Sequence, residues 1–338
     1  MTAILGLNAY HGDAAAALVV DGGLVAAAEE ERFTRLKHVA GFPSLAAAWC
    51  LEYAGLAAGD LDHVAIGRDP RANLGAKVVQ TLRRVRNPSY VSDRVRSMRR
   101  VRGLKDHLAA ALGTSPDALR GTFHNVEHHQ AHAASAFFVS PFDEAAVLTL
   151  DGFGDFASAL VAVGRGNRLE VLDRVVFPHS LGIYYTAVTQ WLGFPKYGDE
   201  GKVMGLAPYG DPEVHRARMR DVVRLEGLFE LNLEYFTHHV HGVDMTWAEG
   251  SPTIGPLYSL RLEDAFGPPR APGDELTRHH EDVAGALQAV LEDAYLHAVG
   301  VAQRRTGLAN LCLAGGVALN AVANGRIRRE TAFDELYV

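Results

Sequence analysis

Cysteine is scarce in this chain: its 338 residues include only Cys50 and Cys312, which lie far apart and inside apolar runs. Disulfides belong mainly to secreted proteins, where cysteines occur in larger paired sets. These two residues are therefore interpreted as buried free thiols of a protein from a reducing compartment.

The sequence also lacks a surplus of basic residues, a membrane span and a leader signature. Its formal net charge is −7, which argues against a general nucleic-acid-binding protein. No uncharged apolar run is long enough to cross a bilayer, and Met1-Thr2 leads into a predicted strand without a basic region or cleavage signature. We expect a cytoplasmic protein with no membrane partner, whose 48% hydrophobic residues fill one large or two medium domains.

What the sequence does contain is an apparent internal duplication. A strand at 4–8, a turn at 9–13, a strand at 14–20, the hairpin turn Asp21-Gly22 and a returning strand at 24–28 begin the chain. The same order of strand, Gly/Asp turn, strand, Gly turn and strand recurs from residue 146, so that Asn8 aligns with Asp151.

Two such meanders are typical of actin-like and sugar-kinase-like ATPases, which hold phosphates between two lobes with backbone N–H groups. Chance similarity between two hairpins is the alternative. The prediction is an α/β fold with a first lobe at 1–140, carrying a basic helical insertion at about 75–110, and a second lobe at 141–338. Ten lysines and arginines fall between 77 and 105 with few aromatics, which favours a solvated helix over a nucleic-acid patch and leaves an anionic partner open.

A histidine pair lies just before the second meander. His128 and His132 are four residues apart, so they share one face of a predicted helix, and Asp151 ends the apolar strand 147–150. Two imidazoles and a carboxylate suit a divalent transition metal. Among 16 histidines this spacing also arises by chance, so the small residues at 131–135 are what favour a site. The remaining singled-out histidines are interpreted as surface or loop residues: His238, His239, His241, His279 and His280.

Two glycine-rich stretches follow. Residues 196–212 contain four glycines and are predicted to be a loop, in which Lys202 could reach an acyl or phosphoryl group or be an ordinary loop lysine. Ser180 is predicted to cap a helix at 180–192, and the longest helix is expected at 281–306. A strand at 310–314 then enters Gly315-Gly316, which would place a helix N-terminus beside an anion or nucleotide.

Six motifs, spread over essentially the whole chain, together resemble one family. They are HGDAAAAL, EEERFTRLKH, HHQAHAASAF, LTLDGFGD, GDEGKVMGLAPYG and LAGGVALN. The chain resembles the O-carbamoyltransferases, which include nodulation-factor and antibiotic-tailoring carbamoyltransferases. This resemblance implies duplicated actin/Hsp70-like (ASKHA) lobes related to the tRNA threonylcarbamoyl transferase.

The resemblance also implies site residues. His128, His132 and Asp151 would bind a divalent metal, usually iron. The first-turn histidine maps onto His11, which Gly12 separates from Asp13, whereas the family has the two adjacent; His11 would act as the general base. The other implied contacts to carbamoyl groups, phosphate or nucleotide are Lys37, Gly152, Gly154, Lys202, Gly315, Gly316 and Asn320.

Family members are longer, with a C-terminal domain that converts carbamoyl phosphate and ATP to carbamoyl adenylate, and with a late Gly-Asp motif that supplies another metal ligand. Neither occurs in this sequence, so we expect the N-terminal transferase lobe, truncated in its second half. The expected reaction transfers the carbamoyl group to a hydroxyl of a sugar or natural-product acceptor, as in antibiotic biosynthesis. ATP and Fe²⁺ are the expected cofactors, and a homodimer is left open.

Two other functions are compatible with the same features. An actin-fold ATPase or kinase would share the two phosphate turns but would not need the histidine pair. A non-catalytic nucleotide-binding module would bind without turnover. The acceptor is not identified, because sugars, aminoglycosides, macrolides and nodulation factors all offer hydroxyls.

Overall fold

The computed structural model describes residues 1–75, 77, 103–243, 245–246 and 252–338. It divides into two compact units. The first unit comprises Met1–His128 and the described residues of 245–253. The second unit comprises the described residues of 129–244 and Ile254–Val338. The basic insertion predicted at about 75–110 lies mostly outside the described residues, which resume at Gly103.

The first unit is built on a five-stranded sheet with the order β3-β2-β1-β4-β5. Its strands are β1 (Ala3–Asn8), β2 (Ala15–Val20), β3 (Gly23–Glu29), β4 (His63–Ile66) and β5 (Thr122–Asn125). β1, β2 and β3 pair antiparallel as a meander, whereas β4 and β5 run parallel to β1. Alternate residues of β1 are buried, because successive side chains of a strand point to opposite faces.

Helices cover the buried face of this sheet. The main ones are α2 (Ser44–Ala54) and α5 (Leu104–Ala111), and the short helix α1 spans Glu31–Thr34. The start of α2 is held by Glu30, whose buried carboxylate accepts hydrogen bonds from Leu45 N at 3.1 Å and Ala46 N at 2.8 Å. Such bonds satisfy the free N–H groups at a helix start. Gly55, with φ 67°, ends the helix in the left-handed conformation that glycine adopts readily.

The second unit repeats this strand order in a larger sheet, β8-β7-β6-β13-β14. Its strands are β6 (Glu144–Gly154), β7 (Ala157–Arg165), β8 (Arg168–Val176), β13 (Asn310–Ala314) and β14 (Glu335–Tyr337). β6, β7 and β8 form the antiparallel meander, and β13 and β14 add parallel strands. The predicted α/β fold with duplicated actin-like lobes is confirmed by this shared topology.

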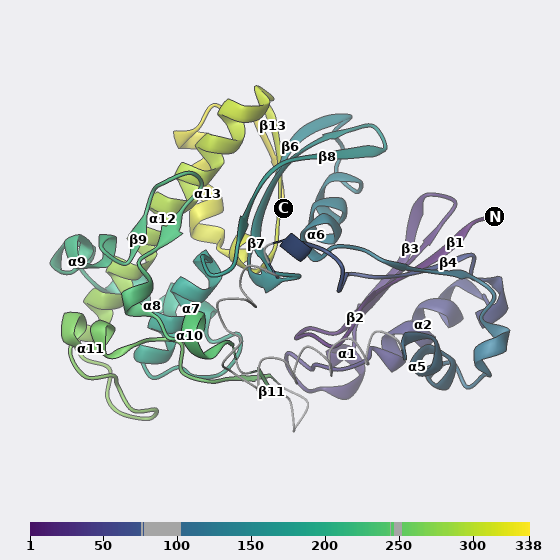
Figure 1. Cartoon of the computed structure of the whole chain (residues 1–338), viewed down its shortest axis with the longest axis horizontal. Helices are drawn as coiled ribbons and strands as arrows, with labels where there is room; N and C mark the ends of the chain where they lie inside the picture. Colours follow the sequence, from purple (N-terminus) through teal and green to yellow (C-terminus); the bar gives the residue numbers. More distant parts are fainter. Residues whose placement is uncertain (76, 78–102, 244, 247–251) are drawn as a thin grey trace. The chain divides into compact units, whose positions relative to one another are not determined.

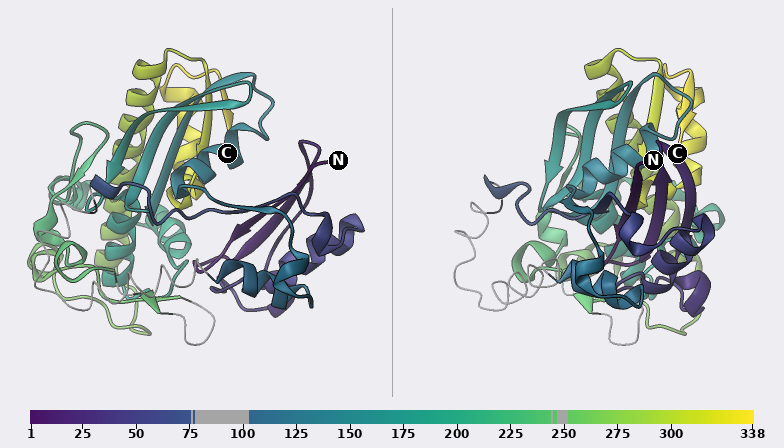
Figure 2. Two further views of the ribbon diagram at one scale, coloured as in Figure 1. Left: turned by 45° about the vertical axis from the view of Figure 1, so that its right-hand side comes forward. Right: turned by 90° about the vertical axis from the view of Figure 1, so that its right-hand side faces the viewer.

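Helices lie on both faces of the second sheet (Figures 1 and 2). The face that carries Leu148 and Leu150 packs against α7 (Leu181–Trp191) and α12 (Arg278–Thr306). The opposite face, with Val147 and Leu160, packs against α6 (His128–Phe137). Further elements complete the unit: α8 (Glu200–Leu206), α9 (Arg216–Arg220), β9 (Val223–Arg224), β10 (Glu230–Leu231), α10 (His238–His241), α11 (Leu260–Phe266) and α13 (Ala321–Glu330). The two-residue strands β11 (Met245–Thr246) and β12 (Thr253–Ile254) pair with each other near the division between the units.

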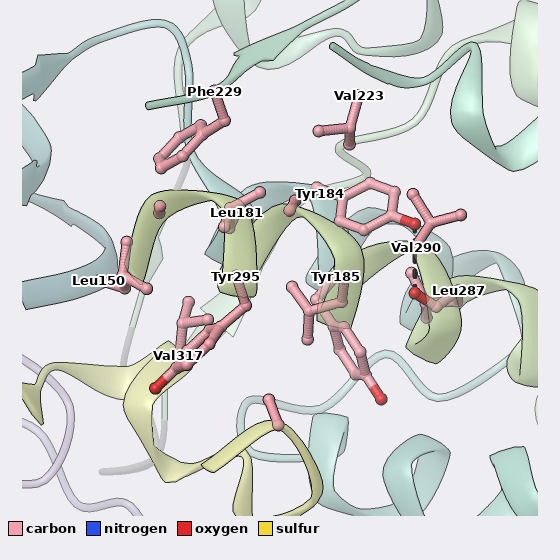
Figure 3. Close-up of a cluster of buried hydrophobic side chains, with 14 of the residues drawn as sticks. Leu150, Leu181, Tyr184, Tyr185, Val223, Phe229, Leu287, Val290, Tyr295 and Val317 are labelled. Atoms are coloured by element: carbon pink, nitrogen blue, oxygen red, sulfur yellow. Dashed lines mark hydrogen bonds between the residues drawn. The ribbon is translucent and has the colours of Figure 1, made fainter. Parts of the chain in front are cut away.

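Aromatic side chains form the centre of the larger core (Figure 3). Tyr184 and Tyr295 are fully buried, and the Tyr184 hydroxyl donates to the carbonyl of Leu287 at 3.3 Å. Burial raises the pKa of both phenols, because the charged form would lose its hydration. α7 begins at its predicted cap, since the Ser180 hydroxyl accepts a hydrogen bond from Ile183 N at 3.1 Å.

The structure differs from the sequence-based interpretation in several places. Residues 196–212 are not a continuous loop, because they include α8 and the 3₁₀ turn Ala207–Tyr209. Val203 explains α8: its side chain is completely buried in the large core, and this packing outweighs the low helix propensity of the surrounding glycines. The alternating apolar residues at 229–235 form only the two-residue strand β10 and a 3₁₀ turn at Leu233–Tyr235.

The interpretation of His238 as a surface residue is wrong. Its side chain is fully buried, and its Nε2 lies 2.8 Å from the carbonyl oxygen of Pro178. The rings of Phe153 and Phe177 lie 6.0 and 5.7 Å from its ring centre. The buried thiols of Cys50 and Cys312 are confirmed, with the pKa of both raised by burial.

The boundary between the units falls at the first residue of α6, ahead of the division predicted at 140. The physical reason is that Ala133, Ala136 and Phe137 of α6 pack against the second sheet. Within the described residues, no helix combines the length and apolar character that crossing a bilayer requires.

Candidate metal centre

Helix α6 lies closely on the second sheet because the residues between them are small. Ala133 and Ala136 are almost completely buried against the face of β6 and β7 that carries Val147. Phe137 lies over Gly164, where an added Cβ would come within 2.5 Å of the phenyl ring. The alanines of α6, and Gly164 beneath Phe137, therefore allow the helix to approach the sheet closely.

This packing brings the three predicted metal ligands together. Imidazole nitrogens of His128 and His132 and a carboxylate oxygen of Asp151 all lie within 4.8 Å of one another. His132 Nε2 is 3.2 Å from Asp151 Oδ2. The side chains of His132 and Asp151 are 30% and 16% exposed, so the group is sheltered but can be reached from solvent. Two imidazoles and a carboxylate match the donor set of Zn²⁺ or Fe²⁺ sites.

Asp151 is also fixed by the turn after β13. Gly316 N–H donates a hydrogen bond to Asp151 Oδ1 at 3.1 Å, and the Ser180 hydroxyl donates to the Asp151 carbonyl at 2.9 Å. A Cβ at Gly316 would lie 2.9 Å from Oδ1, and Gly315 has φ 97°. The paired glycines thus allow the turn to approach the carboxylate, with one oxygen held by Gly316 and the other facing His132.

The turn at the end of β6, which follows Asp151, is also closely packed. Gly152 lies against α7, because a Cβ at Gly182 would be 2.7 Å from Gly152 N. Gly154 ends β6, and the tight turn continues through Asp155 and Phe156, whose φ values are 47° and 77°. Gly152 and Gly154 are therefore backbone positions close to Asp151, where the sequence analysis predicts contacts to a nucleotide or a carbamoyl group.

In the first unit, Asp13 of the turn after β1 forms a separate polar cluster with Glu31 and His38. Oxygens of Asp13 and Glu31 and a ring nitrogen of His38 lie within 4.8 Å of one another. His38 Nδ1 is 2.8 Å from Asp13 Oδ1, and the His38 N–H donates to Glu31 Oε2 at 3.1 Å. Asn8 holds this turn by donating from Nδ2 to the carbonyls of Gly12 at 3.3 Å and Asp13 at 2.8 Å.

The other predicted residues of the first unit lie in or beside the same turn. His11 is half-buried, its backbone forms an antiparallel bridge with Gly41, and its ring centre lies 5.6 Å from that of His128. Lys37 is exposed and adjoins His38 in sequence. The sequence reasoning missed Glu31 and His38 as site candidates, although both lie in the EEERFTRLKH motif that it quoted.

Lys202 and Asn320 have identified partners in the second unit. Lys202 lies on α8, 60% exposed, with its ammonium 2.6 Å from Asp199 Oδ1. Asn320 is buried and caps α13, since its Oδ1 accepts from Ala323 N at 3.0 Å. Its Nδ2 donates to Gln288 Oε1 at 3.0 Å.

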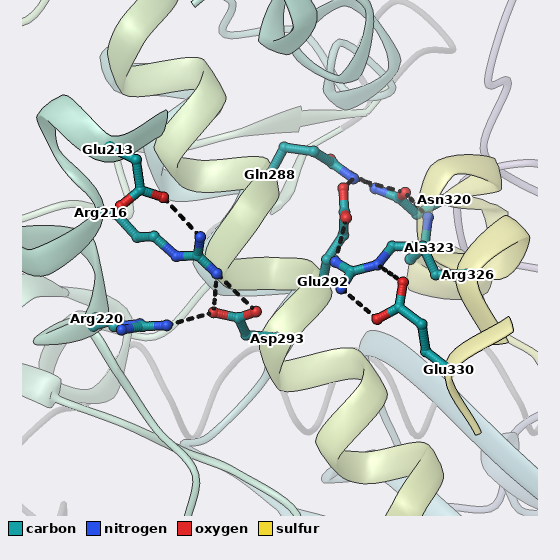
Figure 4. Close-up of polar contacts among 10 residues, drawn as sticks. All are labelled: Glu213, Arg216, Arg220, Gln288, Glu292, Asp293, Asn320, Ala323, Arg326 and Glu330. Atoms are coloured by element: carbon teal, nitrogen blue, oxygen red, sulfur yellow. Dashed lines mark hydrogen bonds and ion pairs between the residues drawn. The ribbon is translucent and has the colours of Figure 1, made fainter. Parts of the chain in front are cut away.

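Asn320 is one member of a polar network between α12 and α13 (Figure 4). Gln288 Nε2 donates to Glu292 Oε1 at 2.8 Å, and Arg326 bonds both Glu292 and Glu330 at 2.6 Å. These carboxylates, Glu330 first, raise the pKa of the Arg326 guanidinium. The network fixes the segment that follows Gly315-Gly316, so the turn beside Asp151 is supported from α12.

Comparison with known proteins identifies the family. The family model described as carbamoyltransferase N-terminus matches residues 3–338. An uncharacterized protein of Synechocystis sp. is 40% identical over 350 residues, which cover 100% of this chain and 54% of that protein. Nodulation protein NolNO of Sinorhizobium fredii is 37% identical over 331 residues, which cover 98% of this chain and 44% of that protein. The chain thus spans about half the length of these relatives.

Solved structures show weaker similarity. Component A of (R)-2-hydroxyglutaryl-CoA dehydratase from Acidaminococcus fermentans has 12% identity and a TM-score of 0.46, covering 99% of this chain and 91% of that one. HypF from T. kodakarensis has 14% identity and a TM-score of 0.42, covering 99% of this chain and 44% of that one. Similarity at this level carries no functional argument. The family match over residues 3–338 and the two relatives above one-third identity show that the chain belongs to the carbamoyltransferase family, whose N-terminal region it matches.

Proposed function

We propose that this chain is the transferase portion of an ATP-dependent O-carbamoyltransferase, which passes a carbamoyl group from carbamoyl adenylate to a hydroxyl of a sugar or natural-product acceptor. Membership of the carbamoyltransferase family supports the general reaction. The observation that carries the proposal is the convergence of His128, His132 and Asp151, because a metal-ligand set in a group-transfer enzyme needs a chemical role.

The residues present fit a divalent transition metal, with Fe²⁺ as the proposed ion. His128 and His132 would supply neutral imidazole nitrogens, and Asp151 a carboxylate oxygen whose partner oxygen is already bonded to Gly316 N–H. Such hydrogen bonds orient a ligand and are part of most metal sites. When bound, the ion would polarise an oxygen of the carbamoyl adenylate and so favour attack at the carbamoyl carbon.

The chain's own residues would handle the proton and the phosphate. In the proposed step, the acceptor oxygen bonds to the carbamoyl carbon, the bond from that carbon to the AMP oxygen breaks, and AMP leaves. His11 would take the acceptor's hydroxyl proton, since an imidazole titrates near working pH. Asp13 Oδ1 contacts His38 Nδ1, and Lys37 and Lys202 are proposed to contact phosphate oxygens.

Backbone groups would hold the nucleotide. Gly152 and Gly154 follow the β6 strand end, and Gly315 precedes the turn that bonds Asp151. Exposed N–H groups in such turns bind anions without a charged side chain. Carbamoyl adenylate would be made from carbamoyl phosphate and ATP by the C-terminal domain found in longer family members.

The experiment incubates the protein with ATP, carbamoyl phosphate and a panel of hydroxylated acceptors, with the carbamoyl-adenylate-forming domain of a longer family member supplied in trans. Mass spectrometry should detect an acceptor heavier by one carbamoyl group in place of a hydrogen, and only when carbamoyl phosphate is present. Asp151→Asn should lose this product. Asp143→Asn is the matched control, because Asp143 is an exposed aspartate before the start of the same strand and should leave the product unchanged.

Two results would contradict the proposal. ATP hydrolysis that ignores carbamoyl phosphate and yields no carbamoylated acceptor would favour an actin-fold ATPase. Tight nucleotide binding without turnover, with the adenylating domain present, would favour a binding module.

A further inference from the structure

Two side-chain bridges connect α6 to β6, and the metal-ligand pair is only one of them. His129 and His132 are three residues apart, so they lie on neighbouring positions of one helix face. Thr149 and Asp151 are two residues apart, so they point to the same face of β6. His129 contacts Thr149, and His132 contacts Asp151, so two side-chain contacts connect the same helix and strand.

The first connection is the more deeply buried one. His129 Nδ1 lies 2.7 Å from Thr149 Oγ1, and both side chains are fully buried. Breaking a hydrogen bond between groups that water cannot reach is unfavourable, because both groups are left without a partner. A shift of α6 along β6, or a rotation about its own axis, would incur this cost.

The alanine contacts of α6 provide little directional restraint. Ala133 and Ala136 pack on the sheet through methyl groups, which keep much of their van der Waals contact when one element slides slightly over the other. A 2.7 Å hydrogen bond is lost after such a shift, because it depends on distance and angle. The His129–Thr149 bond is therefore better suited than the alanine contacts to define one register of α6 on β6.

We propose that His129 is a positioning residue for the metal site: its hydrogen bond to Thr149 sets the register of α6 on β6 and so holds His132 Nε2 at 3.2 Å from Asp151. This inference rests on the proposed metal-binding function. His129 itself donates no bond to the metal. It acts through the helix backbone, which carries His132 three residues later.

The test is a Co²⁺ titration of the whole chain, followed by visible absorption. Thr149→Val keeps the shape of the side chain and removes the hydroxyl. We expect it to weaken Co²⁺ binding by about 10–100-fold, the usual effect of losing a residue that orients a metal ligand. Thr149→Ser restores a hydroxyl and should recover most of the affinity. If Thr149→Val does not fold, a second pair of variants replaces it. His129→Asn keeps a polar atom near the Nδ1 position and should bind Co²⁺ more tightly than His129→Leu, which has none.

Ser158→Ala separates positioning from general loss of stability. Ser158 lies on β7 of the same sheet, is 1% exposed and donates a hydrogen bond to the carbonyl of His179, which is not part of α6. The Ser158→Ala variant should lower the midpoint of thermal unfolding as Thr149→Val does, yet leave the Co²⁺ affinity unchanged.

Each outcome is decisive. Wild-type affinity in Thr149→Val, or equal weakening in Thr149→Val and Ser158→Ala, would overturn the positioning role while leaving the metal site in place. Failure of the wild type to bind Co²⁺ would overturn the metal-binding proposal and the inference with it. Weakening confined to the His129–Thr149 variants supports both.

Discussion

The two units share one sheet topology, but the turn after β1 and the turn after β6 make different contacts. Asn8 ends β1 and Asp151 lies near the end of β6, at aligned positions of the two meanders. The Asn8 amide donates to Gly12 and Asp13, so it holds its own turn. The Asp151 carboxylate instead contacts His132 and Gly316, which come from other elements.

The difference lies in the chemistry of a single side-chain group. An amide both donates and accepts, so Asn8 can satisfy carbonyl oxygens of its own loop. A carboxylate only accepts, so Asp151 must find donors elsewhere and offers negative charge to a cation. Aligned strands and turns thus lead to a polar loop with His11 in the first unit, and in the second unit to an aspartate that we propose as a metal ligand.

The largest expected effect concerns the first turn. His11→Asn should lower kcat for carbamoyl transfer by about 10²–10⁴-fold, because a general base contributes that much. Thermal unfolding should change little, since His11 is only half-buried and lies in a turn rather than in the core. Steady-state kinetics on the acceptor identified by mass spectrometry provide the measurement. A variant with near-normal turnover would remove the chemical distinction between the two turns.

The next effect comes from making the second unit resemble the first. Loss of a residue that only orients a metal ligand weakens metal binding by about 10–100-fold. Asp151→Asn should have at least this effect, because a neutral amide replaces a charged ligand. Metal content after equilibrium dialysis measures the change, with Asp143→Asn as control. Unchanged metal content would mean that Asp151 serves only to bind Gly316 and His132.

The reverse exchange should act on stability. Asn8→Asp removes the donor to two carbonyl oxygens and places a carboxylate near them, which should lower the free energy of unfolding by about 1–3 kcal/mol. It should create no additional Co²⁺ site. Urea unfolding followed by circular dichroism tests the first expectation. A variant as stable as the wild type would show that Asn8 does not hold the turn.

Acid should weaken the second unit by a smaller amount. Burial lowers the pKa of His179 and His215, and His179 Nδ1 accepts a hydrogen bond from Leu231 N at 3.0 Å, which needs the neutral ring. A histidine with a lowered pKa in the folded state contributes stability above about pH 6.5, and this contribution is lost as the pH falls toward the folded-state pKa.

Urea unfolding at pH 7.5 and 5.5 measures this effect. Each unit of pKa shift corresponds to about 1.4 kcal/mol. His215→Gln should reduce the difference between the two pH values, because glutamine does not titrate. An equal difference in the variant and the wild type would exclude His215 as a source.

Much of this comparison was readable in the sequence, because it depends on local periodicity. Alternating strands revealed both meanders, the helical spacing of His128 and His132 was visible directly, and Asp151 ended an apolar run. The register of α6 on β6 was not readable. His129 and Thr149 are 20 residues apart, and nothing in either residue's neighbours marks them as partners.

The remaining errors share one cause: the structure at these positions depends on contacts with segments that are distant in the sequence. α8 forms within a glycine-rich stretch because Val203 is buried in the core, and His238 is buried among aromatic rings from other segments. His38 and Asp13 meet across 25 residues through left-handed backbone at both positions, which Asp and His adopt only occasionally.

The central claim is that His128 and His132 of α6 and Asp151 of β6 bind a divalent metal. The direct measurement is metal content of the purified protein after loading with Fe²⁺ or Co²⁺ and gel filtration, for the wild type and for His128→Ala/His132→Ala. The control is His63→Ala/His124→Ala, which removes another pair of neighbouring histidines, 3.1 Å apart on β4 and β5. The account predicts that the first double variant loses the metal and the control retains it, whereas equal metal content in all three proteins would contradict it.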